Sequence, residues 1–363
     1  MNYRKIVLSK YSHFPGDPEI VLGGICLALT DRAGQVVWNA FREDDWQLLT
    51  LMARTEGLAP LMYDFFKRIG PEKAGITEKS FQALAQDYYQ TAAYNALLFE
   101  ELEIILKSFE KAEISVVLLK GAALAQTVYP DPALRPMSDL DLLVPFDKAN
   151  KALEILENLE YRAQEYSYWS NIRPIFAQSY HLESGRGGIV ELHWKLLRKV
   201  KSAQRLTEWA WDETLSMEDS CPTSSLTGDT TRMIQSKVLS TSSNLFYLSS
   251  HLFVKHGVAR GQLLWLYDIH KLLTSQKKTF DWENVLRYSK KFSLNSVVIT
   301  VLQQLDMIFH TSYPITTFLE NLNEHLEDDI EQLISDMTQP NLHRGRIWWI
   351  SWQTLNWHEK MLF

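Results

Sequence analysis

Residues 114–144 read ISVVLLKGAALAQTVYPDPALRPMSDLDLLV and contain the first clear evidence of a β-sheet. The stretch opens with an apolar run, rich in β-branched residues, at residues 114–119. Charged residues flank the run and Gly121 follows, and this pattern predicts a short buried strand. A short helical piece and a turn rich in Pro and Asp follow. Residues 139–144 then predict a second strand, so a sheet is expected to begin in this part of the chain.

The segments on either side of this stretch have helical patterns. Trp46, Leu49 and Ala53 recur at helical spacing, and the chain reads as helix again from about residue 240. Further strands are predicted at residues 180–183 and 189–195, joined by a glycine-rich hairpin. We therefore predict an α+β fold with three parts: a mainly helical region over residues 1–112, an α/β core with a mixed sheet over 113–235, and a helical region over 236–363.

The composition of the 363-residue chain is typical of a folded soluble protein, since 46% of its residues are hydrophobic and 22% are charged. Its net charge of −7 argues against a surface that coats nucleic acid or an anionic membrane. The apolar residues 20–29 are too few to span a bilayer, and the basic start is not followed by the apolar core of a secretory signal. Cys26 and Cys221 form no metal-ligand spacing. We expect a cytoplasmic protein that does not bind membranes.

Three carboxylates of the predicted core have the pattern of a metal site. Side chains of a strand alternate between its two faces, so Asp139 and Asp141 are predicted to lie side by side. Neighbouring carboxylates repel each other unless a hard cation offsets the repulsion. Glu191, on a later strand, can reach the same edge of the sheet. The three carboxylates, together with substrate phosphates, would complete two magnesium sites. Manganese is the alternative ion. The simpler alternative is that Asp-x-Asp is a solvated strand end or a helix cap.

The order of these motifs resembles the nucleotidyltransferase superfamily of the DNA polymerase β type. More narrowly, Leu119-Lys120-Gly121, Arg135, residues 138–144 and Glu191-Leu192-His193-Trp194 are similar to a bacterial family of uncharacterised nucleotidyltransferases, over about residues 40–280. The resemblance implies a nucleotidyltransferase-like mixed sheet flanked by helices. It also implies an enzyme that binds an NTP such as ATP, transfers the nucleoside monophosphate to an acceptor hydroxyl and releases pyrophosphate.

The resemblance implies roles for the matching residues. Asp139 and Asp141 would hold both metal ions, and Glu191 would bind the ion that activates the acceptor hydroxyl. His193 shares a strand face with Glu191, so it would either orient that carboxylate or simply pack. The residues expected to contact the nucleotide are Lys120, Gly121, Ala122, Arg135 and Ser138. The superfamily usually has Ser where this chain has Ala122, so one phosphate donor is lost, and Lys120 and Arg135 would supply the positive charge.

Other functions remain open at this point. Ala122 favours a catalytically weak or inactive relative that binds nucleotide and acts as an interaction or regulatory module. A basic segment at residues 195–205 suggests nucleic-acid or pyrophosphate binding, although the net charge disfavours nucleic acid. The sequence does not identify the acceptor; a small molecule is favoured over a protein or an RNA, and residues 251–268 are the expected wall of its site.

Overall fold

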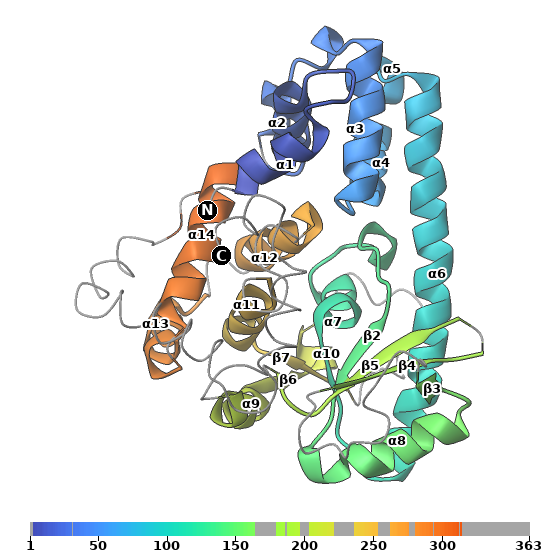
Figure 1. Cartoon of the computed structure of the whole chain (residues 1–363), viewed down its shortest axis with the longest axis vertical. Coiled ribbons are helices and arrows are strands. Elements are labelled where there is room, and N and C mark those ends of the chain that lie inside the picture. The colour runs from blue at the N-terminus through green and yellow to red at the C-terminus, as the bar shows by residue number, and fades with distance from the viewer. Residues whose placement is uncertain are drawn as a thin grey trace, which may run out of the picture.

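The computed structural model describes residues 3–30, 32–163, 179–185, 187–196, 203–220, 236–252, 262–275, 280–292, 294–311 and 313. Helices build the part of the chain that precedes the first strand. They are α1 (Tyr3–Tyr11), α2 (Pro18–Ala28), α3 (Glu43–Thr55), α4 (Ala59–Ile69), α5 (Pro71–Ala74) and the long α6 (Glu78–Lys111). Helix α6 runs along one side of the molecule from these helices down to the sheet (Figure 1).

A mixed sheet follows, with seven strands in the described residues and the order β3-β4-β5-β2-β1-β7-β6. Its strands are β1 (Val117–Leu118), β2 (Leu140–Leu143), β3 (Arg162–Ala163), β4 (Ser179–Glu183), β5 (Ile189–His193), β6 (Thr214–Ser216) and β7 (Lys237–Leu239). The pairs β2–β5 and β1–β7 are parallel, and the other neighbours are antiparallel. The helices within this part are α7 (Lys120–Thr127), α8 (Ala149–Asn158), α9 (Ala203–Asp212) and α10 (Met217–Ser220).

Helices return after the sheet and complete the predicted α+β arrangement, which is confirmed. They are α11 (Thr241–Ser250), α12 (Leu263–Ser275), α13 (Trp282–Lys291) and α14 (Asn295–Phe309). The predicted core ends at residue 235, whereas β7, which pairs with β1, begins at Lys237. In the part of the chain that the structure describes, no helix combines the length and the apolar character needed to cross a membrane.

The central strands β1 and β2 are buried on both faces, because their alternate residues enter two different cores. Val117 and Leu143 belong to a large apolar cluster that also joins the N-terminal and C-terminal helices, from Tyr3 to Phe309. Leu118 and Leu142 belong to a second cluster, which α6 and α8 complete. The two helical regions, far apart in the sequence, therefore share one core above the sheet, while α6 and α8 cover the other face.

Side chains in the middle of α6 form hydrogen bonds with the loop that leads into β2. The Asn95 side-chain amide donates hydrogen bonds to the backbone carbonyls of Pro132 and Arg135, at 2.8 and 2.9 Å. The preceding residue of α6, Tyr94, donates its hydroxyl hydrogen to the Ser138 carbonyl at 3.2 Å. These bonds give backbone carbonyls of the loop side-chain partners from α6. Helix α6 thus fixes the chain just before the two aspartates.

Glu56, at the end of α3, joins three distant segments. Its carboxylate is buried and accepts hydrogen bonds from the Tyr11 hydroxyl at 3.1 Å and from Lys10 Nζ at 3.0 Å. The second carboxylate oxygen accepts from the Leu263 amide at 2.9 Å, so the side chain caps the N-terminus of α12. A buried carboxylate needs such partners, and their arrangement ties α1 and α12 to α3.

Gly188, which precedes β5, leaves room for a buried carboxylate of α6. The Glu101 carboxylate accepts hydrogen bonds from the hydroxyls of Tyr161 and Ser184, and a Cβ at Gly188 would collide with it. We expect Gly188→Ala to destabilise the protein by about 1–3 kcal/mol through overpacking. The shift of the urea unfolding midpoint measures this effect. Gly185→Ala is the matched control, since its Cβ would meet no atom within 4 Å; equal effects at the two glycines would contradict this account.

Candidate functional site

The register of two parallel strands brings Asp141 and Glu191 together. Asp141 of β2 and Glu191 of β5 are direct register partners, and partners on adjacent strands point to the same face. His193 follows Glu191 by two residues and therefore shares that face. One ligand atom from each of these three side chains lies within 4.8 Å of the other two. We call Asp141, Glu191 and His193 the carboxylate–histidine cluster.

His193 contacts both carboxylates of the cluster. Its Nε2 lies 2.8 Å from Asp141 Oδ1 and 3.5 Å from Glu191 Oε2. The imidazole is almost completely buried, and its Nδ1 has no hydrogen-bond partner in the described part of the chain. The structure thus brings together three residues that the sequence pattern singled out, but it places His193 closer to Asp141 than to Glu191.

Lys120 places its ammonium on the same carboxylates. Nζ lies 2.5 Å from Asp141 Oδ1 and 3.5 Å from Glu191 Oε2. Lys120 is the first residue of α7 and has a φ of +44°, a left-handed conformation that is uncommon for a residue with a side chain. Such strain is found where the surroundings require it, often at functional sites. The sharp turn connects β1 to α7 beside the cluster, and contact of this turn with a nucleotide stays a prediction.

Asp139 lies at the border of the cluster, one residue before β2. It is half-buried and accepts a hydrogen bond at 2.9 Å from the hydroxyl of Ser138, which is exposed. Asp139 interacts electrostatically with Asp141, Glu191 and Lys120. The predicted neighbourhood of the three carboxylates is therefore present, although Asp139 is not among the residues whose ligand atoms converge within 4.8 Å.

The two aspartates experience opposite electrostatic effects. Burial and the charge of Asp141 raise the pKa of Asp139 above its usual value. Burial also opposes ionisation of Asp141, but the Lys120 charge and the His193 hydrogen bond outweigh it and hold the pKa of Asp141 low. Divergent pKa values in one cluster are typical of sites that bind ions or transfer protons.

Arg135 is engaged in a buried ion pair. Its Nη2 lies 2.8 Å from Asp268 Oδ2 of α12, and the Tyr129 hydroxyl donates to Asp268 Oδ1 at 2.7 Å. A Cβ at Gly121 would collide with the Arg135 guanidinium, so Gly121 makes room for this side chain. The predicted proximity of Gly121 and Arg135 is present. Its observed basis is packing and ion pairing, and contact of either residue with phosphate stays a prediction.

Ala122 is buried in the first turn of α7, next to Gly121. The helix has no side-chain cap at its N-terminus, where Leu119 precedes it in an extended conformation. The first N–H groups of a helix have no partner within it, which suits them to bind an anion. Loss of the usual Ser hydroxyl at position 122 therefore leaves backbone donors in place.

Sequence reasoning missed Tyr247 of α11. This buried tyrosine forms a side-chain hydrogen bond with Lys120 and interacts electrostatically with Asp141 and Glu191. Burial raises the pKa of Tyr247, although the Lys120 charge opposes the rise. No spacing motif connects residue 247 with residues 120–191. A tyrosine within a helical apolar pattern looks like an ordinary core residue, so the sequence contained no signal for this role.

The predicted acceptor wall at residues 251–268 is described only in part. Asp268 reaches the Arg135 side of the core, and the Tyr267 ring packs edge-to-face against Tyr129. Lys255 of this segment lies outside the described residues, as do Arg198, Lys199 and Lys201 of the basic segment. The C-terminal region thus contacts the core through α11 and α12, while acceptor selection stays a prediction.

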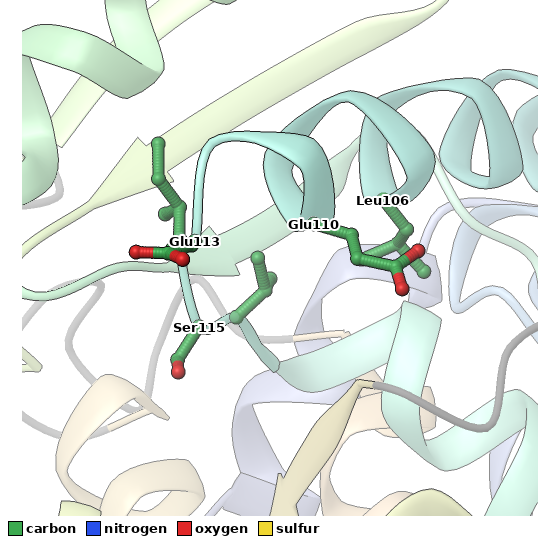
Figure 2. Close-up of a pocket in the computed structure, with 6 residues that line it drawn as sticks. Leu106, Glu110, Glu113 and Ser115 are labelled. Carbon is green, nitrogen blue, oxygen red and sulfur yellow. The ribbon is translucent and has the colours of Figure 1, made fainter.

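A hollow of about 390 Å³ lies at the other end of β1, and Figure 2 shows it at the C-terminus of α6. It is lined by Leu106, Glu110, Glu113, Ile114, Ser115 and Val116. These residues precede β1, whereas Lys120 follows it, so the hollow is separate from the carboxylate–histidine cluster. Its two glutamates make it unfavourable for phosphates.

Comparison with known proteins identifies the family to which this site belongs. The family model described as uncharacterised nucleotidyltransferase matches residues 42–310, which include every residue of the site described above. The chain belongs to this nucleotidyltransferase family. The match confirms the resemblance carried by the motifs at residues 119–194, and it extends through α14.

The chain is also similar to a solved structure. An antigenic nucleotidyltransferase-like protein from Paracoccidioides brasiliensis shares 14% sequence identity with it, at a TM-score of 0.31. The similarity covers 59% of this chain and 97% of that one. A comparison with curated proteins finds no match.

Proposed function

We propose that this protein transfers a nucleoside monophosphate from an NTP to an acceptor hydroxyl and releases pyrophosphate, using a divalent metal held by the carboxylate–histidine cluster. The observation that carries the proposal is the convergence of Asp141, Glu191 and His193 on neighbouring parallel strands. Membership of the nucleotidyltransferase family gives the reaction class.

The donor set fits a hard or borderline divalent cation. Carboxylate oxygens suit Mg²⁺ and Mn²⁺, and a buried imidazole nitrogen adds a donor that Mn²⁺ also accepts. Asp141, Glu191 and His193 would hold one ion, and Asp139 would help to hold a second one beside it. Bound ions would polarise the phosphoryl group and favour deprotonation of the acceptor hydroxyl.

The other residues would bind and orient the nucleotide. The N–H groups in the first turn of α7, at Gly121 and Ala122, would donate to phosphate oxygens, assisted by the positive end of the helix dipole. Ser138 is exposed beside Asp139 and would contact the nucleotide or the departing pyrophosphate. Asp268 balances the Arg135 charge, so contact of Arg135 with phosphate would require its guanidinium to leave that carboxylate. Helices α11 and α12 would border the site of a small-molecule acceptor, as their residues Tyr247 and Asp268 suggest.

A thermal-shift screen with the four NTPs, each with and without Mg²⁺ or Mn²⁺, tests the proposal. A ligand that binds only the native state stabilises the protein by about 2.7 kcal/mol when its free concentration is 100 times its Kd. We therefore expect at least one NTP to raise the unfolding temperature in the presence of metal, and little effect from metal-free NTP. No shift with any combination would contradict nucleotide binding at this site.

The rival function is nucleotide binding without transfer, which the buried Ala122 in place of Ser favours. Once the preferred NTP is known, pyrophosphate release can be measured against a panel of small hydroxyl compounds. Release that depends on both metal and acceptor supports the transferase. Binding without release for any acceptor class, including protein and RNA, would support the rival.

A further inference from the structure

Lys120 already occupies the oxygens that a metal ion would need. Its Nζ contacts Asp141 Oδ1 and Glu191 Oε2, and these are the same two atoms that His193 Nε2 approaches at 2.8 and 3.5 Å. A divalent ion bound by the cluster would therefore lie next to the ammonium group. Two cations at such separations repel strongly in a partly buried site.

The position of Lys120 is built into the fold. Its side chain is only 13% exposed, the left-handed backbone directs the turn at the end of β1, and Tyr247 supplies another hydrogen-bond partner. Although burial favours the neutral amine, Asp141 and Glu191 lie next to Nζ and favour its charged form. The ammonium thus neutralises part of the negative charge of a buried cluster, which would otherwise be destabilising.

We propose that Lys120 is a built-in cation that competes with the divalent metal for Asp141 and Glu191 and leaves these carboxylates when the metal binds. The inference rests on the proposed function, because it concerns the same metal site. Lys120 has a flexible four-carbon side chain and starts at the first turn of α7, where the triphosphate is proposed to bind. Displacement by metal would thus free a positive charge for the phosphates, so that metal and nucleotide binding favour each other.

Titration calorimetry of the full chain with MnCl₂, without nucleotide, tests the competition. Lys120→Met keeps a long side chain and removes the charge, so we expect it to bind Mn²⁺ at least about tenfold more tightly than the wild type. Lys151→Met is the matched control, because Lys151 pairs with Glu154 on exposed α8 and the substitution changes the net charge equally. Its affinity should equal that of the wild type.

Two outcomes of the titration overturn the inference in different ways. Mn²⁺ binding of equal or lower affinity in Lys120→Met refutes the competition alone and leaves the metal site of the proposed function intact. Absence of Mn²⁺ binding in the wild type and in both variants refutes the metal site itself, and the competition with it. Equal tightening in Lys120→Met and Lys151→Met assigns the effect to net charge and also refutes the competition.

A measurement on the wild-type chain keeps the inference testable if Lys120→Met fails to fold. Lysine acylation followed by mass spectrometry of the peptide that contains Lys120 reports how accessible its amine is. We expect Mn²⁺ to increase the acylation rate of Lys120 severalfold and to leave that of Lys151 unchanged. An unchanged or lower rate at Lys120 under Mn²⁺ saturation would show that the ammonium stays on the carboxylates.

Discussion

Asp141→Asn is expected to abolish nucleotidyl transfer and to weaken Mn²⁺ binding by more than about 100-fold. Even residues that only support metal ligands contribute about 10–100-fold to affinity or activity, and Asp141 is proposed to bind the metal directly. The amide has the shape of the carboxylate but lacks its charge. It would therefore keep contacts with Lys120 and His193 while removing the attraction for a cation. Titration calorimetry with MnCl₂ measures the loss.

Asp147→Asn is the matched control for this experiment, because Asp147 is exposed in the turn after β2 and the chemical change is identical. It should bind Mn²⁺ like the wild type. If Asp141→Asn still binds Mn²⁺ with wild-type affinity while the protein remains folded, the carboxylate–histidine cluster is not the metal site.

Arg135→Ala is expected to reduce the free energy of unfolding by about 3–5 kcal/mol, the range for breaking a buried ion pair. The substitution would leave the buried Asp268 carboxylate with Tyr129 but without a cation. The shift of the urea midpoint measures this effect. Arg54→Ala removes an arginine from the exposed pair with Asp87 and should cost no more than about 1 kcal/mol, which makes it the control.

A double variant separates the ion pair from the loss of arginine volume. Arg135→Met combined with Asp268→Asn removes both charges and retains a hydrogen-bond partner for Tyr129, so it should recover much of the stability that Arg135→Ala loses. If Arg135→Ala instead unfolds like the wild type and only weakens NTP binding, Arg135 is a phosphate ligand, as the sequence motif implies.

The strands that carry the site could be predicted from the sequence, because local patterns determine them. Alternation and β-branched residues predict β4 and β5 to within a residue or two of their observed bounds, and the glycine-rich connection between them predicts a hairpin. Two-residue spacing also predicted which side chains share a face with Glu191. The first strand was predicted over 114–119, but β1 covers Val117–Leu118, because β7 and β2 pair with only those two residues.

The contacts that complete the site could not be predicted, since they join segments far apart in the chain. Arg135 meets Asp268, and Lys120 meets Tyr247, across more than a hundred residues. Nothing in local periodicity indicates which buried polar residue will pair with which. The positive charge of Lys120 was expected to face phosphate, whereas tertiary packing directs it to the neighbouring carboxylates.

Glu56 has a consequence for which part of the chain can fold by itself. The family match begins at residue 42, yet Lys10 and Tyr11, which bind the Glu56 carboxylate, lie before it. A fragment trimmed to residues 42–310 would retain that buried charge and lose these two partners together with the Tyr3 hydroxyl, which donates to Glu56 Oε2 at 3.3 Å. The same carboxylate caps α12, the helix that presents Asp268 to Arg135. The support that α1 gives to Glu56 and α12 therefore lies outside the family-matched segment, and we expect a fragment of residues 42–310 to be less stable than the full chain.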